Sequence, residues 1–99
     1  MARIETLSDL RSHKREICRL AALRGAENLR VLGSFSRDQA RADSDIDLLV
    51  DLLPGHGLLD LGSLLMDLEE LLCRSVELLT EQGILPASRE RVLAGMVAL

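Results

Sequence analysis

Seven of the eight leucines between residues 58 and 73 place the strongest constraint on how this chain can fold. At about 100° per residue they fall within an arc of roughly 140°, which predicts an amphipathic helix. The seven are Leu58, Leu61, Leu64, Leu65, Leu68, Leu71 and Leu72. Such a face must be covered by another apolar surface. The segment Ile46–Leu52, "IDLLVDL", supplies one, because it is apolar enough to form a strand buried on both faces.

The remaining pattern alternates helices with short strands. Residues 8–24 predict a helix that ends at Gly25, residues 28–34 a strand that enters a Gly-Ser turn, and residues 75–80 a third strand. A short helix or helical turn is expected after the first strand. Pro86 then opens a last helix, whose buried side is expected to carry Val92, Leu93, Met96 and Leu99. The order α-β-α-β-α-β-α predicts an α/β fold, with a small mixed sheet of about three core strands packed by helices.

The length and composition limit the class of protein. The 99 residues are expected to form one domain, residues 1–99, and 47% hydrophobic with 28% charged residues exclude a disordered chain. No apolar run approaches the ~20 residues that span a bilayer, and the first residues lack the apolar core of a secretory signal. A net charge of −4 and a single aromatic residue, Phe35, argue against nucleic-acid binding. We therefore expect a cytoplasmic protein with no membrane contact and no direct nucleic-acid binding.

Two groups of residues are candidate contact surfaces. Basic residues crowd the first third of the chain, at Arg11, Lys14, Arg15, Arg19, Arg24 and Arg30. They form either a solvated helix face or a docking surface for an acidic partner or for phosphates. Leu59 and Met66 fall on the polar side of the leucine-rich helix, either as scattered exposed residues or as a small patch for a partner.

Two carboxylates stand at the start of the central predicted strand. Asp45 and Asp47 are one residue apart, so in a strand they would project to the same face with Cα atoms about 6.7 Å apart. Two charges that close repel each other, and a divalent ion such as Mg²⁺ would relieve the repulsion. The alternative is an acidic turn that leads into a strand, with Ser44 and Asp45 as turn residues.

A third acid and a glycine-containing turn favour a binding site. Glu77 lies among apolar neighbours in the third predicted strand, where it either faces water at a sheet edge or joins Asp45 and Asp47 in one cleft. Three carboxylates could bind two metals, or provide two ligands and a general base. Gly33 and Ser34 follow a strand, where backbone N–H groups can approach phosphates.

The joint pattern resembles a known family. Gly33-Ser34, ten intervening residues and then Asp45-Ile46-Asp47 resemble the G-S-x10-D-x-D signature of the nucleotidyltransferase superfamily related to DNA polymerase β. Arg37 stands where the family has arginine in G-S-x-x-R, and Ser44 stands at the serine of S-D-x-D. The smallest members are the minimal nucleotidyltransferases, which are encoded beside a HEPN-domain toxin, and the resemblance covers nearly the whole chain.

The resemblance implies a palm-like fold and transfer of AMP from ATP to a hydroxyl, a tyrosine of the HEPN ribonuclease toxin in those pairs. Gly33 and Ser34 would hold the β- and γ-phosphates, with Arg37 and Ser44 also on the nucleotide. Asp45 and Asp47 would hold the Mg²⁺ that carries the triphosphate, and together with Glu77 a second Mg²⁺.

Two departures from the family pattern affect this expectation. Asp38 replaces the family's glycine and would add a negative charge near the phosphates, and Glu77 replaces an aspartate. One alternative is therefore an antitoxin that neutralises its toxin by binding alone. Another is a nucleotidyltransferase for a small molecule, which would need a further domain to hold the acceptor.

Overall fold

The protein is described by a computed structural model that covers residues 3–99. Two short helices, α1 (Leu7–Arg11) and α2 (Lys14–Leu23), replace the single helix expected over residues 8–24. The break falls at Ser12, whose hydroxyl donates a hydrogen bond of 2.5 Å to the carbonyl oxygen of Asp9 and so competes with helical pairing. Thr6 and Asp9 form a capping box at the start of α1.

Four strands form one mixed sheet, in the order β3-β2-β1-β4. Strand β1 (Ala26–Leu32) pairs antiparallel with β2 (Ile46–Leu52), and β2 pairs parallel with β3 (Val76–Leu79). The parallel pair is joined through α4 (Leu58–Leu72), as a crossover helix requires. The predicted α/β fold with a small mixed sheet is confirmed, and the helix expected over residues 58–73 is observed almost residue for residue.

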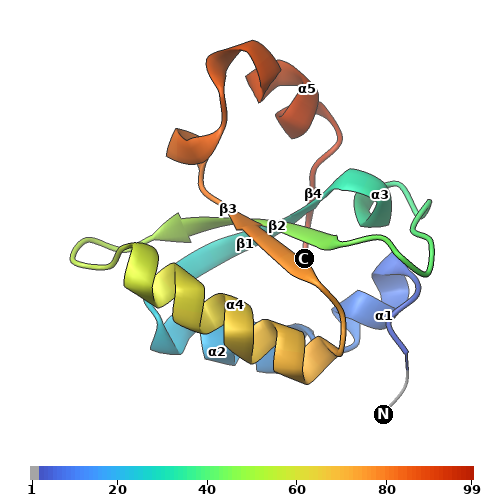
Figure 1. Cartoon of the computed structure of the whole chain (residues 1–99), viewed down its shortest axis with the longest axis horizontal. Coiled ribbons are helices and arrows are strands. Elements are labelled where there is room, and N and C mark those ends of the chain that lie inside the picture. The colour runs from blue at the N-terminus through green and yellow to red at the C-terminus, as the bar shows by residue number, and fades with distance from the viewer. Residues whose placement is uncertain (1–2) are drawn as a thin grey trace.

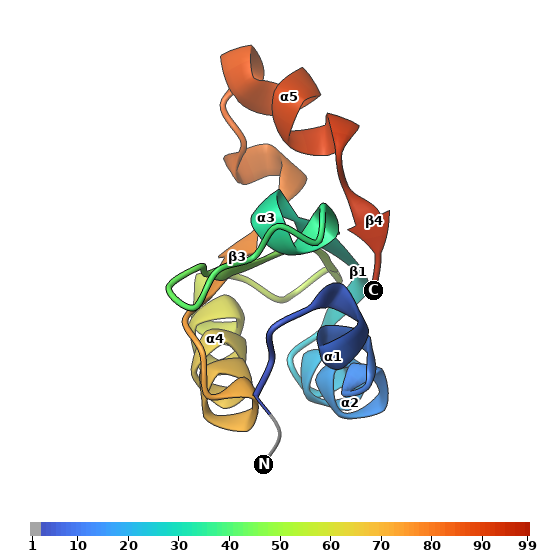
Figure 2. The same cartoon turned by 90° about the vertical axis from the view of Figure 1, so that its right-hand side faces the viewer.

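The two faces of the sheet are in different surroundings: one packs against helices in the core, and Asp47 projects from the other. Ile46, Leu48 and Val50 point from β2 into the core against α2 and α4, and all three are fully buried. In Figures 1 and 2, α1, α2 and α4 all lie on this side of the sheet. Each buried leucine or isoleucine side chain contributes about 1.5–3 kcal/mol to the hydrophobic term. Because side chains alternate along a strand, Asp47 and Leu49 project from the opposite face.

Most of the leucine face is buried as expected, with one exception. Leu64, Leu68 and Leu72 are in the core, whereas Leu58 is 84% exposed. Leu58 is the first residue of α4, at the end of the loop that follows β2. Leu59 and Met66 are exposed, as the polar-side position predicts.

The end of the chain differs from the expected single helix. Pro86–Ser88 forms a 3-10 turn (η2), α5 spans only Arg89–Ala94, and Gly95 caps it. A two-residue strand, β4 (Val97–Ala98), then pairs with β1. Met96 is consequently exposed at 36%, and Leu99 is buried beside the sheet rather than on a helix. The free edge of β1 therefore captures residues that the sequence pattern assigns to the helix.

The C-terminal segment crosses the second face of the sheet. It begins with the 3-10 turn η1 (Glu81–Gly83) and continues through η2 and α5. Figures 1 and 2 show α5 and α3 (Gly33–Ser36) on the side opposite α2 and α4. Within residues 3–99, no helix is long and apolar enough to cross a membrane.

Candidate active site

A cavity of about 200 Å³ lies on the second face of the sheet, between the start of β2, α3 and α5. Four of the predicted site residues line it: Gly33, Arg37, Asp47 and Glu77. They come from three different elements of the chain. The fold thus brings both ends of the sequence motif and the third acid to one place.

The register of the parallel strands pairs the two strand acids. Asp47 of β2 is the direct neighbour of Glu77 of β3. Partial burial, followed by the charge and hydrogen bonding of Glu77 and the charge of Asp45, raises the pKa of Asp47 from 3.8 to about 6. One oxygen of Asp47, Oδ1, is buried and has no hydrogen-bond partner. The site therefore concentrates negative charge and leaves one carboxylate oxygen unsatisfied.

The backbone of Gly33 lies close to the side chain of Asp47. Its φ is +67°, in the left-handed region that favours glycine. A Cβ at this position would lie 2.5 Å from Oδ2 of Asp47, which is closer than any real contact. The glycine of the motif is therefore required both by the backbone turn into α3 and by the space that the Asp47 carboxylate occupies.

The other predicted residues lie around this centre. Asp45 is exposed immediately before β2 and does not line the cavity, although its charge acts on Asp47. Ser34 is half-buried in α3. Ser44 is used in the turn before β2, where its Oγ accepts a hydrogen bond of 2.8 Å from the Arg41 backbone N–H. The turn interpretation is therefore correct for Ser44, while Asp47 is in the strand and faces the cavity.

Asp38 is accommodated by its own backbone and side-chain geometry. Its φ is +53°, so this position needs a residue that tolerates the left-handed region, as glycine and aspartate do. Its Oδ1 accepts a hydrogen bond of 3.1 Å from the Leu7 backbone N–H at the start of α1. The charge expected near the phosphates is thus engaged with α1, and Asp38 does not line the cavity.

Two arginines, one at the cavity and one at the turn before β2, carry no sequence signal. Arg91, from α5, lines the cavity together with Asp47 and Glu77. Arg74 stacks over the ring of Phe35 at 5.1 Å and donates hydrogen bonds to the carbonyl oxygens of Ile4, Arg41 and Ser44. It thereby connects α3 to the turn that precedes Asp45. No motif marks either arginine, because Arg91 reaches the cavity, and Arg74 the turn before Asp45, only through the tertiary fold.

The acids at the cavity fit a divalent cation. Within residues 3–99, no three His, Cys, Asp or Glu side chains are grouped so that they could hold a metal ion by themselves. The crowded Asp47–Glu77 pair with the unsatisfied Oδ1 nevertheless matches the hard oxygen donors that Mg²⁺ prefers. Mg²⁺ usually takes one or two carboxylates and completes its coordination with substrate phosphates and water.

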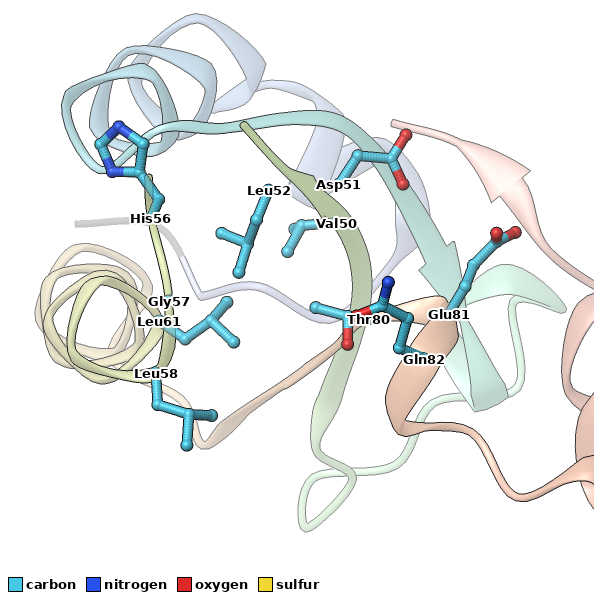
Figure 3. Close-up of a pocket in the computed structure, with 10 residues that line it drawn as sticks. All are labelled: Val50, Asp51, Leu52, His56, Gly57, Leu58, Leu61, Thr80, Glu81 and Gln82. Atoms are coloured by element: carbon cyan, nitrogen blue, oxygen red, sulfur yellow. The ribbon is translucent and has the colours of Figure 1, made fainter. Parts of the chain in front are cut away.

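A larger cavity, of about 420 Å³, lies at the other end of β2. Figure 3 shows Leu52, Leu58 and Leu61 along one side of it, with the carboxylates of Asp51 and Glu81 turned away from them. Both carboxylates pair with Arg30, at 2.5 and 3.8 Å. None of the predicted site residues lines this cavity, so the chemistry of the motif is located at the smaller one.

Comparison with known proteins decides the family. A model of the nucleotidyltransferase domain matches residues 10–99, which include every predicted site residue. The chain belongs to the nucleotidyltransferase-domain family. It is 38% identical over 80 residues to the "Putative protein adenylyltransferase MJ0435" of Methanocaldococcus jannaschii, covering 81% of this chain and 86% of that protein.

Solved structures agree with the fold of this nucleotidyltransferase domain. The "Structure of putative minimal nucleotidyltransferase" superposes with a TM-score of 0.83 at 41% identity, over 95% of this chain and 96% of that one. The "Crystal structure of the toxin-antitoxin with AMP-PNP" superposes with a TM-score of 0.72 at 18% identity, over 86% of this chain and 70% of that one. The resemblance to minimal nucleotidyltransferases is confirmed.

Proposed function

We propose that this nucleotidyltransferase-domain protein is an antitoxin that transfers AMP from ATP to a hydroxyl of a partner toxin. The single observation that carries the proposal is the Asp47–Glu77 pair packed against Gly33 in one cavity. The relative named as a protein adenylyltransferase supports a protein acceptor. The toxin–antitoxin structure with AMP-PNP, which shares the fold, supports a toxin partner and an adenine nucleotide. We further propose that the partner is a HEPN ribonuclease and the acceptor a tyrosine, which neutralises the toxin.

Different residues bind the phosphates and the metal in this proposal. Gly33 and Ser34 hold the β- and γ-phosphates, and Arg37, which lines the cavity, neutralises phosphate charge. Ser44 holds the turn that sets the approach to Asp45. Asp45, Asp47 and Glu77 hold Mg²⁺, in our proposal two ions, which supplies charge neutralisation at the phosphates.

The transfer itself is a substitution at phosphorus. The acceptor oxygen forms a bond to the α-phosphorus, and the bond from that phosphorus to the bridging oxygen breaks. Pyrophosphate leaves with the bonding electron pair, and the hydroxyl proton passes to the Glu77 carboxylate, which is exposed beside Asp47. Fixed positions and charges at the cavity supply the acceleration.

In this proposal, docking of the toxin on the folded domain positions the acceptor hydroxyl at the cavity. The exposed basic residues of α1 and α2, or the exposed Leu59 and Met66, are the surfaces available for that contact. The whole chain, residues 1–99, acts as one domain in this proposal.

A second candidate function is an antitoxin that binds its toxin without transferring a nucleotide. The observation that favours it is that no three potential ligands are grouped for a metal in the described part of the chain. Glu77 is one methylene longer than the family's aspartate, so the geometry with which it would bind a metal differs. In this case the acids retain nucleotide or metal binding only.

Transfer of label distinguishes these functions. The purified protein is incubated with α-labelled ATP, Mg²⁺ and the product of the neighbouring gene. Label on the partner, lost in the Asp45→Asn plus Asp47→Asn double variant, is the expected result. Tight complex formation with no label on the partner would establish binding alone.

A melting experiment tests the metal and nucleotide site without any partner. Mg²⁺ with ATP is expected to raise the Tm of the wild type more than that of the double variant, because the ligand binds only a folded site with both carboxylates. Equal shifts in the two proteins would remove these acids from the site.

A further inference from the structure

Arg91 is a cation at the nucleotide cavity that no motif assigns. It lies in α5, more than forty residues after Asp47, yet both side chains line the same cavity of about 200 Å³. Among the described residues, Arg91 takes part in none of the side-chain ion pairs, and it is exposed. An exposed arginine outside these ion pairs, beside a pair of carboxylates, is available for an anionic ligand that enters the cavity.

A chain of ion pairs connects the start of α5 to the sheet. Arg89, the first residue of α5, pairs with Glu81 at 3.5 Å. Glu81 also pairs with Arg30 at 3.8 Å, and Arg30 pairs with Asp51 at 2.5 Å. Arg30 is 9% exposed and belongs to β1, so the chain of charges connects the start of α5 to the sheet. The helix that carries Arg91 is therefore linked to β1 through Arg89, Glu81 and Arg30.

The charged residues that line the cavity indicate which kind of ligand Arg91 would bind. Its acids suit a divalent cation, while two arginines, Arg37 and Arg91, also line it. A ligand that satisfies both kinds of group carries several phosphate oxygens and a bound cation, as a nucleoside triphosphate with Mg²⁺ does. Guanidinium groups bind phosphate oxygens with two parallel hydrogen bonds, which an ammonium group cannot match.

We propose that Arg91 binds the β,γ-phosphate end of the nucleotide, so that α5 completes the triphosphate site. This inference rests on the proposed function, because it concerns the same nucleotide. Arg91 is expected to discriminate ATP from AMP, which lacks the β- and γ-phosphates. It stabilises the pyrophosphate that leaves and makes no contact with the acceptor.

Binding measurements with a nucleotide series test the proposal. Titration calorimetry gives the Kd of a non-hydrolysable ATP analogue and of AMP, each with Mg²⁺, for the wild type, Arg91→Ala and Arg91→Lys. Loss of a charge-assisted hydrogen bond predicts at least about tenfold weaker binding of the ATP analogue to Arg91→Ala. The Kd of AMP is expected to stay within about twofold, and Arg91→Lys is expected to be intermediate.

The control is Arg3→Ala, which removes the same charge from an exposed residue whose ion-pair partner is Glu5. It is expected to bind both nucleotides as the wild type does. An unchanged Kd in Arg91→Ala, or an equal loss for the ATP analogue and AMP, would overturn the assignment of Arg91 while leaving the proposed function intact. A wild type that binds neither nucleotide would overturn the proposed function, and the role of Arg91 with it.

Discussion

Asp47 and Glu77 are directly paired residues of two parallel strands, and their carboxyl groups interact across the pair. Parallel strands hold such neighbours on one face, so the repulsion cannot be relieved by turning one side chain through the sheet. The fold tolerates a crowded charge at a place where a substrate or cation would stabilise it. Unsatisfied buried groups of this kind are rare in proteins and are typical of functional sites.

The raised pKa of Asp47 predicts that the contribution of this side chain to stability falls as pH rises. Its pKa is about 6 in the folded protein against 3.8 for an ordinary aspartate, so the folded state binds the proton more tightly. The contribution of Asp47 to the free energy of unfolding should be greatest below about pH 4 and decrease until about pH 6. Urea denaturation at pH 4, 5, 6 and 7 without Mg²⁺ measures this decrease. Asp47→Asn should remove it and be more stable at pH 7 by about 1 kcal/mol, allowing for solvent screening.

Asp43→Asn is the matched control, because Asp43 is exposed in the turn before β2. It should retain the wild-type pH dependence. If Asp47→Asn and the wild type lose stability in parallel between pH 4 and pH 6, Asp47 is not the group that titrates.

The contact between Gly33 and Asp47 predicts a specific coupling. Gly33→Ala should destabilise the protein by about 1–3 kcal/mol, since it combines a positive φ with a Cβ placed 2.5 Å from Oδ2 of Asp47. In an Asp47→Ala background the same change should cost less, because only the backbone strain remains. A double-mutant cycle measured by urea denaturation gives this interaction energy.

Gly62→Ala serves as the reference for an ordinary glycine. Gly62 lies in α4 with no atom near its missing Cβ, so alanine should stabilise the helix by about 0.5–1 kcal/mol. Additive effects of Gly33→Ala and Asp47→Ala would contradict the close contact.

The sequence predicts the site better than its surroundings for physical reasons. Strand alternation is a local property, so it correctly places Asp47 outside the core while Ile46 and Leu48 are inside. The pairing of Glu77 with Asp47 follows once the two strands are adjacent and parallel. The role of Arg91 depends on how residues 81–96 cross the sheet, which has no local periodicity.

The end of the chain shows the same limit. The apolar spacing of Val92, Leu93 and Met96 favours a longer helix, but Gly95 ends α5 and the edge of β1 binds the following residues. Such pairing is a tertiary interaction, which overrides helical propensity. The structural role of Asp38 has no local sequence signal either, because the backbone N–H that its side chain binds belongs to Leu7, 31 residues away.

The contacts of Arg74 predict that the turn before β2 affects both stability and nucleotide binding. It donates hydrogen bonds to three backbone carbonyls and stacks on Phe35, which a lysine cannot reproduce. Arg74→Lys should reduce the free energy of unfolding by about 1–3 kcal/mol. Because Ser44 precedes Asp45, this variant should also bind Mg²⁺ with the ATP analogue more weakly.

Urea denaturation and calorimetry measure the two effects separately. Arg41→Lys is the control, since only the backbone of exposed Arg41 takes part in these contacts. It should stay within about 0.5 kcal/mol of the wild type. A stable Arg74→Lys variant with unchanged nucleotide affinity would show that the turn does not depend on Arg74.

The two ion pairs of Glu81 predict that the contact between α5 and the sheet can be weakened without changing a residue of the nucleotide cavity. Glu81 pairs with both Arg30 and Arg89, so Glu81→Gln weakens both contacts between the sheet and the C-terminal segment. Hydrogen exchange should become faster in residues 81–96 and remain unchanged in β2, because only the segment is released. The ATP analogue should bind less tightly, by about threefold to tenfold, since Arg91 is less well positioned.

Glu90→Gln separates this effect from a simple loss of charge, because Glu90 is exposed on the same short helix and is not one of the ion-paired residues. It should exchange and bind as the wild type does. Faster exchange throughout the chain in Glu81→Gln would instead mean that the whole fold is destabilised. Unchanged exchange in residues 81–96 would mean that packing, rather than the Arg30–Glu81–Arg89 charges, holds α5 over the site.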